Sequence, residues 1–153
     1  LGWISQIERD KSQPSIDDLR DLAHVLNVPL SILFGQTSSG SEEEGYIVRK
    51  SARRVIGSNS SGLKEELLSP DLTDDFEVVY STFEPNSKLA KTQKRQTQEV
   101  GYVISGSLVL NIDGKEFKVS EGDSFRIKGE AHSWANPFSK PCNIIWVIAP
   151  PIY

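Results

Sequence analysis

The sequence of 153 residues contains no methionine, one cysteine and two histidines. Without methionine the chain has no initiator residue. Because it also opens inside an expected helix, we expect the natural chain to begin before Leu1. A single cysteine, Cys142, excludes a disulfide within the chain, which suits the reducing cytoplasm that we expect as its location. The sequence has no signal-peptide pattern and no apolar run near the ~20 residues that span a bilayer, which argues against membrane and secreted proteins.

A net basic charge is also absent. The formal net charge is −4, so no overall basic field attracts the protein to nucleic acid. Hydrophobic residues make up 37% and charged residues 25% of the chain, which are ordinary values for a soluble globular protein. The length suffices for one ordinary domain, or for a small domain with part of another.

The first 34 residues carry the spacing of amphipathic helices. Ile4 and Ile7 share one helical face, and "KSQPS" then ends that helix. Ser15 is a good N-cap for a second helix. Apolar residues recur in this second helix at spacings of three and four, at Leu19, Leu22, Ala23 and Leu26. A further short helix is expected after Pro29.

Residues 35–45 are small, polar and acidic, and predict a linker. From residue 46 onward the pattern changes to short stretches rich in β-branched and aromatic residues. The eight predicted strands lie within residues 46–50, 53–57, 76–85, 99–106, 107–112, 115–119, 123–127 and 143–150. Asp113 and Gly114 predict a two-residue hairpin turn. Many short strands with almost no helical periodicity predict a mainly β domain, an antiparallel sandwich or barrel.

The helical part also carries a family pattern, in the stretch "WISQIERDKSQPSIDDLRDLAHVLNVPLSILF". It resembles the second half of a lambda-repressor-like helix-turn-helix domain. The matching residues are Ile4, Ser5, Ile7, Glu8, Pro14, Ser15, Leu19, Leu22, Ala23, Leu26, Val28, Pro29 and Leu33. The resemblance implies that residues 1–34 are a partial DNA-binding domain whose first helix reads the major groove.

The same resemblance places the DNA contacts at the start of the chain. The residues that would read bases are Leu1, Gly2, Trp3, Ser5 and Gln6. Two cations, Arg9 and Lys11, would lie nearer the phosphates. The two helices that precede them in the family are missing from this sequence. We therefore expect the apolar residues here to lose burial, and this fragment not to bind DNA competently by itself. The alternative is a helical packing module without a nucleic-acid role.

The second half resembles the cupin family, in "EVGYVISGSLVLNIDGKEFKVSEGDSFRI" and "AHSWANP". The first cupin motif ends with a glutamate, six residues and a glycine, which Glu99 and Gly106 match. The second motif starts at Gly122 and ends with a histidine and, four residues later, an asparagine, matched by His132 and Asn136. The resemblance implies that residues 46–153 form a cupin-type antiparallel β-barrel, or jelly roll.

A cupin metal site uses three histidines and a glutamate, and this sequence lacks that set. Gln93 and Arg95 stand where the family has two of its histidines, so only Glu99 and His132 remain. Nearby lysines would also repel a cation. We therefore expect neither a metal nor another cofactor.

Strand alternation predicts what faces the interior instead. If Glu99 points inward, Gln93, Arg95 and Thr97 share its face and Tyr102 points out. An inward arginine needs a partner, either Glu99 or an anionic ligand that suits the guanidinium fork. The expected ligand-binding residues are Gln93, Arg95, Glu99, His132, Trp134 and Trp146. In the alternative, Arg95 faces solvent, and His132 and the aromatic residues belong to the core.

A helix-turn-helix, a short acidic linker and a cupin-like domain together resemble a known architecture of bacterial transcriptional regulators. The resemblance implies a cytoplasmic DNA-binding repressor or activator, not an enzyme, whose barrel binds a small, anionic metabolite and forms a homodimer. Its partners would be DNA, a small-molecule effector and a second copy, with no membrane. Two alternatives stay open. One is a cupin enzyme, an isomerase or a metal-dependent dioxygenase, with a fused helical segment, and the other is a barrel that serves only dimerisation.

Overall fold

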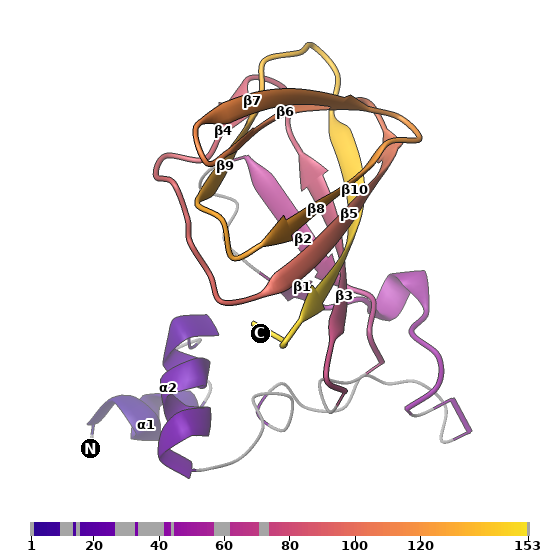
Figure 1. The fold of residues 1–153 in the computed structure, drawn as a ribbon. Coiled ribbons are helices and arrows are strands. Elements are labelled where there is room, and N and C mark those ends of the chain that lie inside the picture. The colour runs from indigo at the N-terminus through magenta and orange to yellow at the C-terminus, as the bar shows by residue number, and fades with distance from the viewer. Residues whose placement is uncertain are drawn as a thin grey trace. The chain divides into compact units, whose positions relative to one another are not determined.

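The computed structural model describes residues 2–9, 14, 16–26, 33, 42–43, 45–56, 62–70 and 74–152. Contacts within the chain divide it into two compact units, residues 1–36 and residues 37–152. The described part of the first unit is helical and that of the second consists mainly of strands, as the sequence predicts (Figure 1). No helix in the described part is long and apolar enough to cross a membrane.

Helices α1 (Gly2–Ile7) and α2 (Ile16–Leu26) lie where the apolar periodicity predicts them. Ala23 is buried, whereas Ile4 and Leu26 keep 48% and 56% of their surface exposed. These helices therefore present apolar side chains that nothing in the described part of the chain covers. The residues outside the description include Ser15, Pro29 and most of the linker at 35–45.

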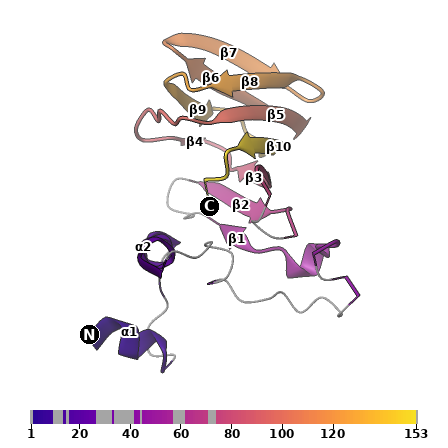
Figure 2. The same ribbon diagram turned by 60° about the horizontal axis from the view of Figure 1, so that its bottom comes forward.

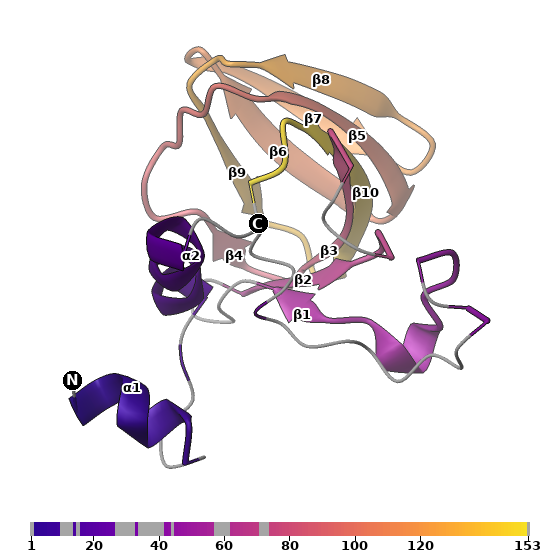
Figure 3. The same ribbon diagram turned by 90° about the horizontal axis from the view of Figure 1, so that it is seen from below.

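The second unit is a barrel of two antiparallel sheets. The larger sheet contains, in spatial order, β1 (Val55–Ile56), β2 (Leu63–Leu67), β3 (Glu77–Phe83), β10 (Cys142–Ala149), β5 (Gln98–Ser105) and β8 (Ser124–Lys128). The smaller sheet contains β4 (Ser87–Lys88), β9 (His132–Asn136), β6 (Ser107–Ile112) and β7 (Lys115–Ser120). Every described pair of neighbouring strands is antiparallel, and the two sheets surround a common interior (Figures 2 and 3). The prediction of an antiparallel β-barrel is confirmed.

The core follows from the strict alternation of buried and less buried residues along the central strands. In β3 and β10 every second side chain is buried, and these side chains face the interior from one side. Leucines of β6 face them from the smaller sheet. Each fully buried aliphatic side chain contributes roughly 1.5–3 kcal/mol of transfer free energy. The fully buried aliphatic residues of the interior include Leu67, Val79, Val103, Leu108, Leu110, Ile127 and Ile144.

Two glycine turns set the registers that the site depends on. Asp113 and Gly114 join β6 to β7 with φ angles of 48° and 78°, the left-handed pair of a tight hairpin turn, as predicted. Gly106 follows β5 with a φ of 82°, and a Cβ there would lie 2.4 Å from the carbonyl oxygen of Pro141. No other residue fits between β5 and β6 without moving the Pro141 loop.

The structure differs from the strand prediction in four places. Residues 46–50 are not a strand, because the Tyr46 and Ile47 N–H groups donate to the Glu43 carbonyl in a local turn that leads to the short 3₁₀ helix η1 (Lys50–Ala52). The Arg49 side chain also pairs with Glu43, which holds the pKa of that glutamate below its ordinary value. Strands β2 and β9 were not predicted, because their charged and polar residues hide the alternation that strands of a barrel normally show. Strand β4 was not predicted either, because its two residues are too few to show a pattern.

Candidate functional site

Strand β5 aims Glu99 into the barrel. Its residues alternate between exposed and buried: Glu99 keeps 3% of its surface exposed, whereas Tyr102 keeps 48%. Thr97, just before the strand, is buried as well. The predicted inward and outward faces of this strand are therefore confirmed, and Glu99 lies in the interior.

Glu99 is a buried carboxylate without a cationic partner in the described part of the chain. Its Oε1 accepts a hydrogen bond of 2.6 Å from the Thr97 hydroxyl. The ion pair with Arg95 that the sequence allowed is not among the described ion pairs. Burying an ionised carboxylate is costly unless hydrogen bonds and an opposite charge compensate for lost water. One neutral donor compensates only partly, so this position suits a cationic group from outside the chain.

A second buried carboxylate, Glu77, shares the interior layer of Glu99. Ile148 of β10 pairs with Glu77 on one side and with Glu99 on the other, so the two glutamates lie two strand spacings apart, roughly 10 Å. Glu77 is 0% exposed, and its Oε1 accepts a 2.9 Å hydrogen bond from the Ile152 N–H. Sequence reasoning missed this residue. The signal was present, since Glu77 occupies an inward position in the alternation of β3.

His132 faces the same interior from the smaller sheet. It is 6% exposed, and its Nδ1–H donates a 3.1 Å hydrogen bond to the Glu130 carbonyl, which leaves Nε2 as an acceptor in the neutral ring. Gln93 lies directly opposite His132, because their backbones exchange two hydrogen bonds of 2.8 Å. Opposed residues of an antiparallel bridge share a face, so half-buried Gln93 accompanies His132.

Arg95 belongs to the irregular segment that precedes β5. The side chain is half-buried, and it has no hydrogen bond or ion pair among the described contacts. Its carbonyl oxygen lies 3.6 Å from where a Cβ of Gly129 would stand, so this segment is close to the loop before His132. Exposed lysines surround the segment, at Lys88, Lys91 and Lys94, with no acidic residue between them. The structure thus gives Arg95 a basic neighbourhood and no internal partner.

Aromatic rings form the wall between the polar end and the aliphatic core. Trp146 packs edge to face against Phe125, with centroids 5.0 Å apart, and Trp134 packs likewise against Phe83 at 4.7 Å. The two tryptophans keep 8% and 9% of their surface exposed. Their packing is that of barrel core residues, so any ligand contact would use only the parts of the rings that neighbours leave free.

The donor set does not fit a cupin metal site. No group of three His, Cys, Asp or Glu side chains that could hold a metal ion occurs among the described residues. Gln93 and Arg95 occupy the two positions that the family resemblance gives to histidines, next to His132 and before Glu99. An amide and a guanidinium are poor partners for a first-row metal beside one imidazole and one carboxylate.

Most residues expected to contact DNA lie on or just after α1. Gln6 and Arg9 are exposed and Ser5 is half-buried. Exposed polar and basic side chains are what groove and phosphate contacts require, and here they lie at the end of α1 and just after it. Gly2 and Trp3 also belong to α1, and the remaining two, Leu1 and Lys11, lie outside the described residues.

Comparison with known proteins identifies both units. Residues 79–148 match the cupin domain family, and residues 4–33 match the helix-turn-helix family. The chain is 30% identical over 146 residues to the HTH-type transcriptional regulator PuuR of Escherichia coli K12, an alignment that covers 93% of this chain and 76% of that protein. The PuuR of Shigella flexneri matches to the same extent.

Solved structures agree on the barrel. An RmlC-like cupin from Shewanella frigidimarina has a TM-score of 0.61 at 19% identity, covering 77% of this chain and 96% of that one. The cupin domain of an XRE family transcriptional regulator from Enterobacter cloacae has a TM-score of 0.52 at 25% identity, covering 59% and 98%. A sugar phosphate isomerase of the cupin superfamily from Silicibacter pomeroyi has a TM-score of 0.51 at 23% identity, covering 59% and 60%. The barrel fold is therefore shared by a regulator and an enzyme.

Proposed function

Because this chain belongs to the family of helix-turn-helix transcriptional regulators that carry a cupin domain, we propose that its barrel binds a small charged metabolite and so regulates DNA binding. The chain is a DNA-binding regulator with a cupin sensor domain. The observation that carries the proposal is the buried, only partly compensated carboxylate of Glu99, at the polar end of an otherwise aliphatic and aromatic interior. A polar group in that place is costly for the free protein and is compensated by a ligand.

The charges at this end favour a ligand that carries both signs. Glu99 offers a carboxylate to a cationic group, and Arg95 offers a half-buried guanidinium to an anionic group, as the sequence suggested. Gln93 and His132 Nε2 would add hydrogen bonds, and Trp134 and Trp146 the apolar wall. A short zwitterionic metabolite, of the amino-acid type, satisfies both charges without a metal.

The same proposal includes a homodimer. A recognition helix reads one half-site, and regulators of this type gain affinity when a two-fold symmetric pair reads two. We propose that α1 is this helix, with Ser5 and Gln6 facing bases and Arg9 facing phosphates. The effector changes DNA affinity only if it binds two arrangements of the pair unequally. We place this activity in the cytoplasm, where the DNA and a reduced Cys142 coexist.

We propose no catalytic role for the barrel. A metal-free isomerase using His132 as acid or base is the rival function, favoured by the buried imidazole with its Nε2 available. The alignment with the transcriptional regulator PuuR covers 93% of this chain, whereas the likeness to the sugar phosphate isomerase covers 59%. If the purified protein turned over sugar phosphates and His132→Gln abolished this activity, the result would contradict the sensor proposal and support a catalytic function.

Ligand binding can be tested by thermal shift and calorimetry on the chain of 153 residues. We would compare ω-amino acids of three to six carbons with carboxylic acids and alkylamines of the same length. We expect the amino acids to stabilise the protein most, because only they reach both Glu99 and Arg95. Glu99→Gln and Arg95→Gln should each weaken binding at least about tenfold, as loss of a charged hydrogen bond does. The matched control Lys94→Gln, in the same basic segment, should bind normally.

Each outcome has a separate meaning. If only carboxylates bind, and only Arg95→Gln loses this binding, the result would support the purely anionic ligand that the sequence predicts. Binding of amines alone, lost in Glu99→Gln only, would remove Arg95 from the site. No stabilisation by any of the three series would contradict the charged-ligand proposal.

A further inference from the structure

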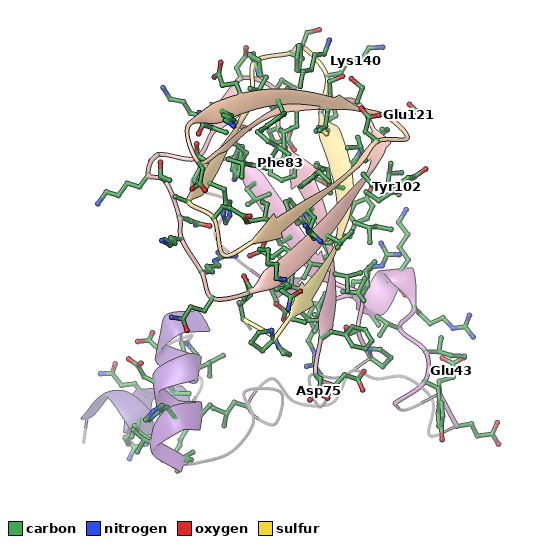
Figure 4. The ribbon with its side chains drawn as sticks, viewed as in Figure 1. Glu43, Asp75, Phe83, Tyr102, Glu121 and Lys140 are labelled. Carbon is green, nitrogen blue, oxygen red and sulfur yellow. The ribbon has the colours of Figure 1, made fainter. Side chains whose placement is uncertain are left out.

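The convex side of the larger sheet carries a continuous row of exposed apolar side chains. Val100, Tyr102 and Ile104 of β5 keep 47%, 48% and 39% of their surface exposed, and Val147 of β10 keeps 41%. They point away from the interior, and Figure 4 shows Tyr102 projecting from the barrel while Phe83 lies within it. We call the outward side chains of β3, β10, β5 and β8 the outer face.

Cross-strand pairing joins these residues, except Ile104 at a β-bulge, into two rows. Val100 pairs with Val147, which pairs with Val78, and Tyr102 pairs with Ile145, which pairs with Tyr80. Such neighbours on one face of a sheet are in side-chain contact. The apolar surface therefore extends over three strands, whereas single surface hydrophobic residues on monomeric proteins are usually scattered.

Three polar side chains of the outer face already bond to one another. The Thr82 hydroxyl donates to Asn143 Oδ1 at 2.9 Å, and Asn143 Nδ2 donates to the Ser105 hydroxyl at 2.9 Å. The Arg53 guanidinium lies over the Tyr80 ring, 5.7 Å from its centroid. The bonded groups of Thr82, Asn143 and Ser105 lose little when water is removed, whereas the buried Arg53 Nε has no hydrogen-bond partner among the described residues.

The size of the outer face matches what a stable dimer needs. Four strands about 4.8 Å apart, the longest of eight residues, give a flat area of roughly 20 by 25 Å. Side-chain relief raises the accessible area toward the ~800 Å² that each partner contributes to an interface of standard size. The composition, aromatic and aliphatic at the centre with charges at the edges, is also that of an interface core and rim.

The charges at the edges select a second copy with a particular orientation. Exposed Arg126 and Lys128 line the face along β8, and Glu66, which also pairs with Lys64 at 3.4 Å, lies at the opposite side on β2. A two-fold axis parallel to the strands brings the β8 edge of each copy toward the β2 edge of the other. An axis across the strands would instead oppose two basic edges. The first arrangement avoids that repulsion and places each basic β8 edge against the Lys64–Glu66 ion pair of the other copy.

We propose that a second copy of this chain docks on the outer face, with the two-fold axis along the strands. This inference rests on the homodimer of the proposed function and assigns it a surface. It also gives the effector a route to the dimer, because alternate residues of β5 face opposite ways. Glu99 and Gly101 face the interior, and Val100 and Tyr102 face the partner. A ligand that shifts β5 from inside shifts the interface outside, and coupling of this kind is reciprocal.

Sedimentation velocity over a concentration series tests the surface directly. We expect the chain to be a dimer, and Tyr102→Glu and Val147→Glu each to raise the dimer dissociation constant at least about 30-fold, as buried interface anchors do. The near-isosteric Val147→Thr should raise it less, in the same direction. The matched control is Phe117→Glu, which changes an equally exposed aromatic residue, 47% exposed, on β7 of the smaller sheet. It should leave the dissociation constant unchanged.

The possible outcomes distinguish this inference from the homodimer proposal on which it rests. Thermal melting of each variant establishes that it is folded, and a variant that does not melt cooperatively is replaced in the comparison by Val147→Thr. Wild-type-like dimers in both glutamate variants would overturn the outer face as the interface and leave the homodimer standing. A monomeric wild-type chain at every concentration would overturn the homodimer itself. A weakened dimer in Phe117→Glu but not in Tyr102→Glu would move the interface to the smaller sheet.

Discussion

Phe125 and Trp146 meet edge to face across the backbone of Gly101, with ring centroids 5.0 Å apart and ring planes at 83°. Gly101 pairs with Phe125 on β8 and with Trp146 on β10, so it stands between the two aromatic residues. A Cβ at this position would lie 2.3 Å from Phe125 Cζ. The absence of a side chain at Gly101 leaves the space in which the two rings meet, two residues along β5 from Glu99.

Gly101→Ala should therefore destabilise the barrel. The methyl group forces the Phe125 ring off Trp146, and overpacking of this kind costs about 1–3 kcal/mol. Urea unfolding followed by tryptophan fluorescence measures the change. In the double variant Gly101→Ala, Phe125→Leu the smaller side chain makes room, so the two substitutions should cost less together than their sum. Additive effects would mean that Phe125 is not the residue displaced.

Burial makes Cys142 inert and stability weakly pH-dependent at alkaline pH. The thiol is 0% exposed, and desolvation raises its pKa to about 11. Between the ordinary thiol pKa near 9 and this value, the folded chain holds a proton that the unfolded chain releases. Stability from this group is thus fully present below about pH 9 and is lost as the pH rises toward 11. Unfolding free energies of wild type and Cys142→Ala should converge over that interval. A constant difference would contradict the raised pKa.

Alternation along strands predicted the part of the site that regular strands hold. The inward Glu99 and outward Tyr102 followed from position alone, because β5 is regular through both. Arg95 lies in an irregular segment, where sequence spacing gives no side-chain direction, so its partner could not be predicted. Of the two partners that the sequence allowed for Arg95, the pair with Glu99 is not among the described ion pairs, and the binding of a ligand by these residues stays a prediction.

Other features depend on partners far along the chain. Glu65 of β2 accepts a hydrogen bond of 3.3 Å from the Ser81 hydroxyl, a contact that makes a charged stretch acceptable as a strand. Asn136 was expected only from a motif, and the structure explains it: its Nδ2 donates to the carbonyls of Phe83 and Lys140. Neither partner is visible from local sequence. The same holds for Glu77 and Glu99, which pair with Ile148 from its two sides and so lie in one layer.

Two turn glycines allow a test of strain against crowding. Gly106 and Gly114 have similar φ angles, 82° and 78°, so alanine pays about 1–2 kcal/mol of left-handed strain at either site. Only Gly106 is crowded, since a Cβ would lie 2.4 Å from the Pro141 oxygen, whereas nothing lies within 4 Å at Gly114. We expect Gly106→Ala to be clearly more destabilising in urea unfolding. Equal losses of unfolding free energy in the two variants would mean that the Pro141 loop moves aside at little cost.

The hydrogen bond between Thr97 and Glu99 should couple the stability of the free barrel to its ligand. Thr97→Val removes the described donor to a buried carboxylate and should destabilise the free protein by about 1–3 kcal/mol, the cost of leaving a buried acceptor unsatisfied. In a Glu99→Gln background the same substitution should cost less, because a neutral amide needs less compensation. A double-mutant cycle in urea measures the difference.

The cycle also distinguishes a ligand site from a plain core hydrogen bond. If a cationic group compensates Glu99 in the complex, a saturating ligand should recover part of the stability that Thr97→Val loses, and should recover none in the Glu99→Gln background. Ser107→Ala serves as the control, since its hydroxyl shares a hydrogen bond with that of Ser120 on the smaller sheet. Equal recovery in Thr97→Val and Ser107→Ala would show that the ligand stabilises the fold generally and does not contact Glu99.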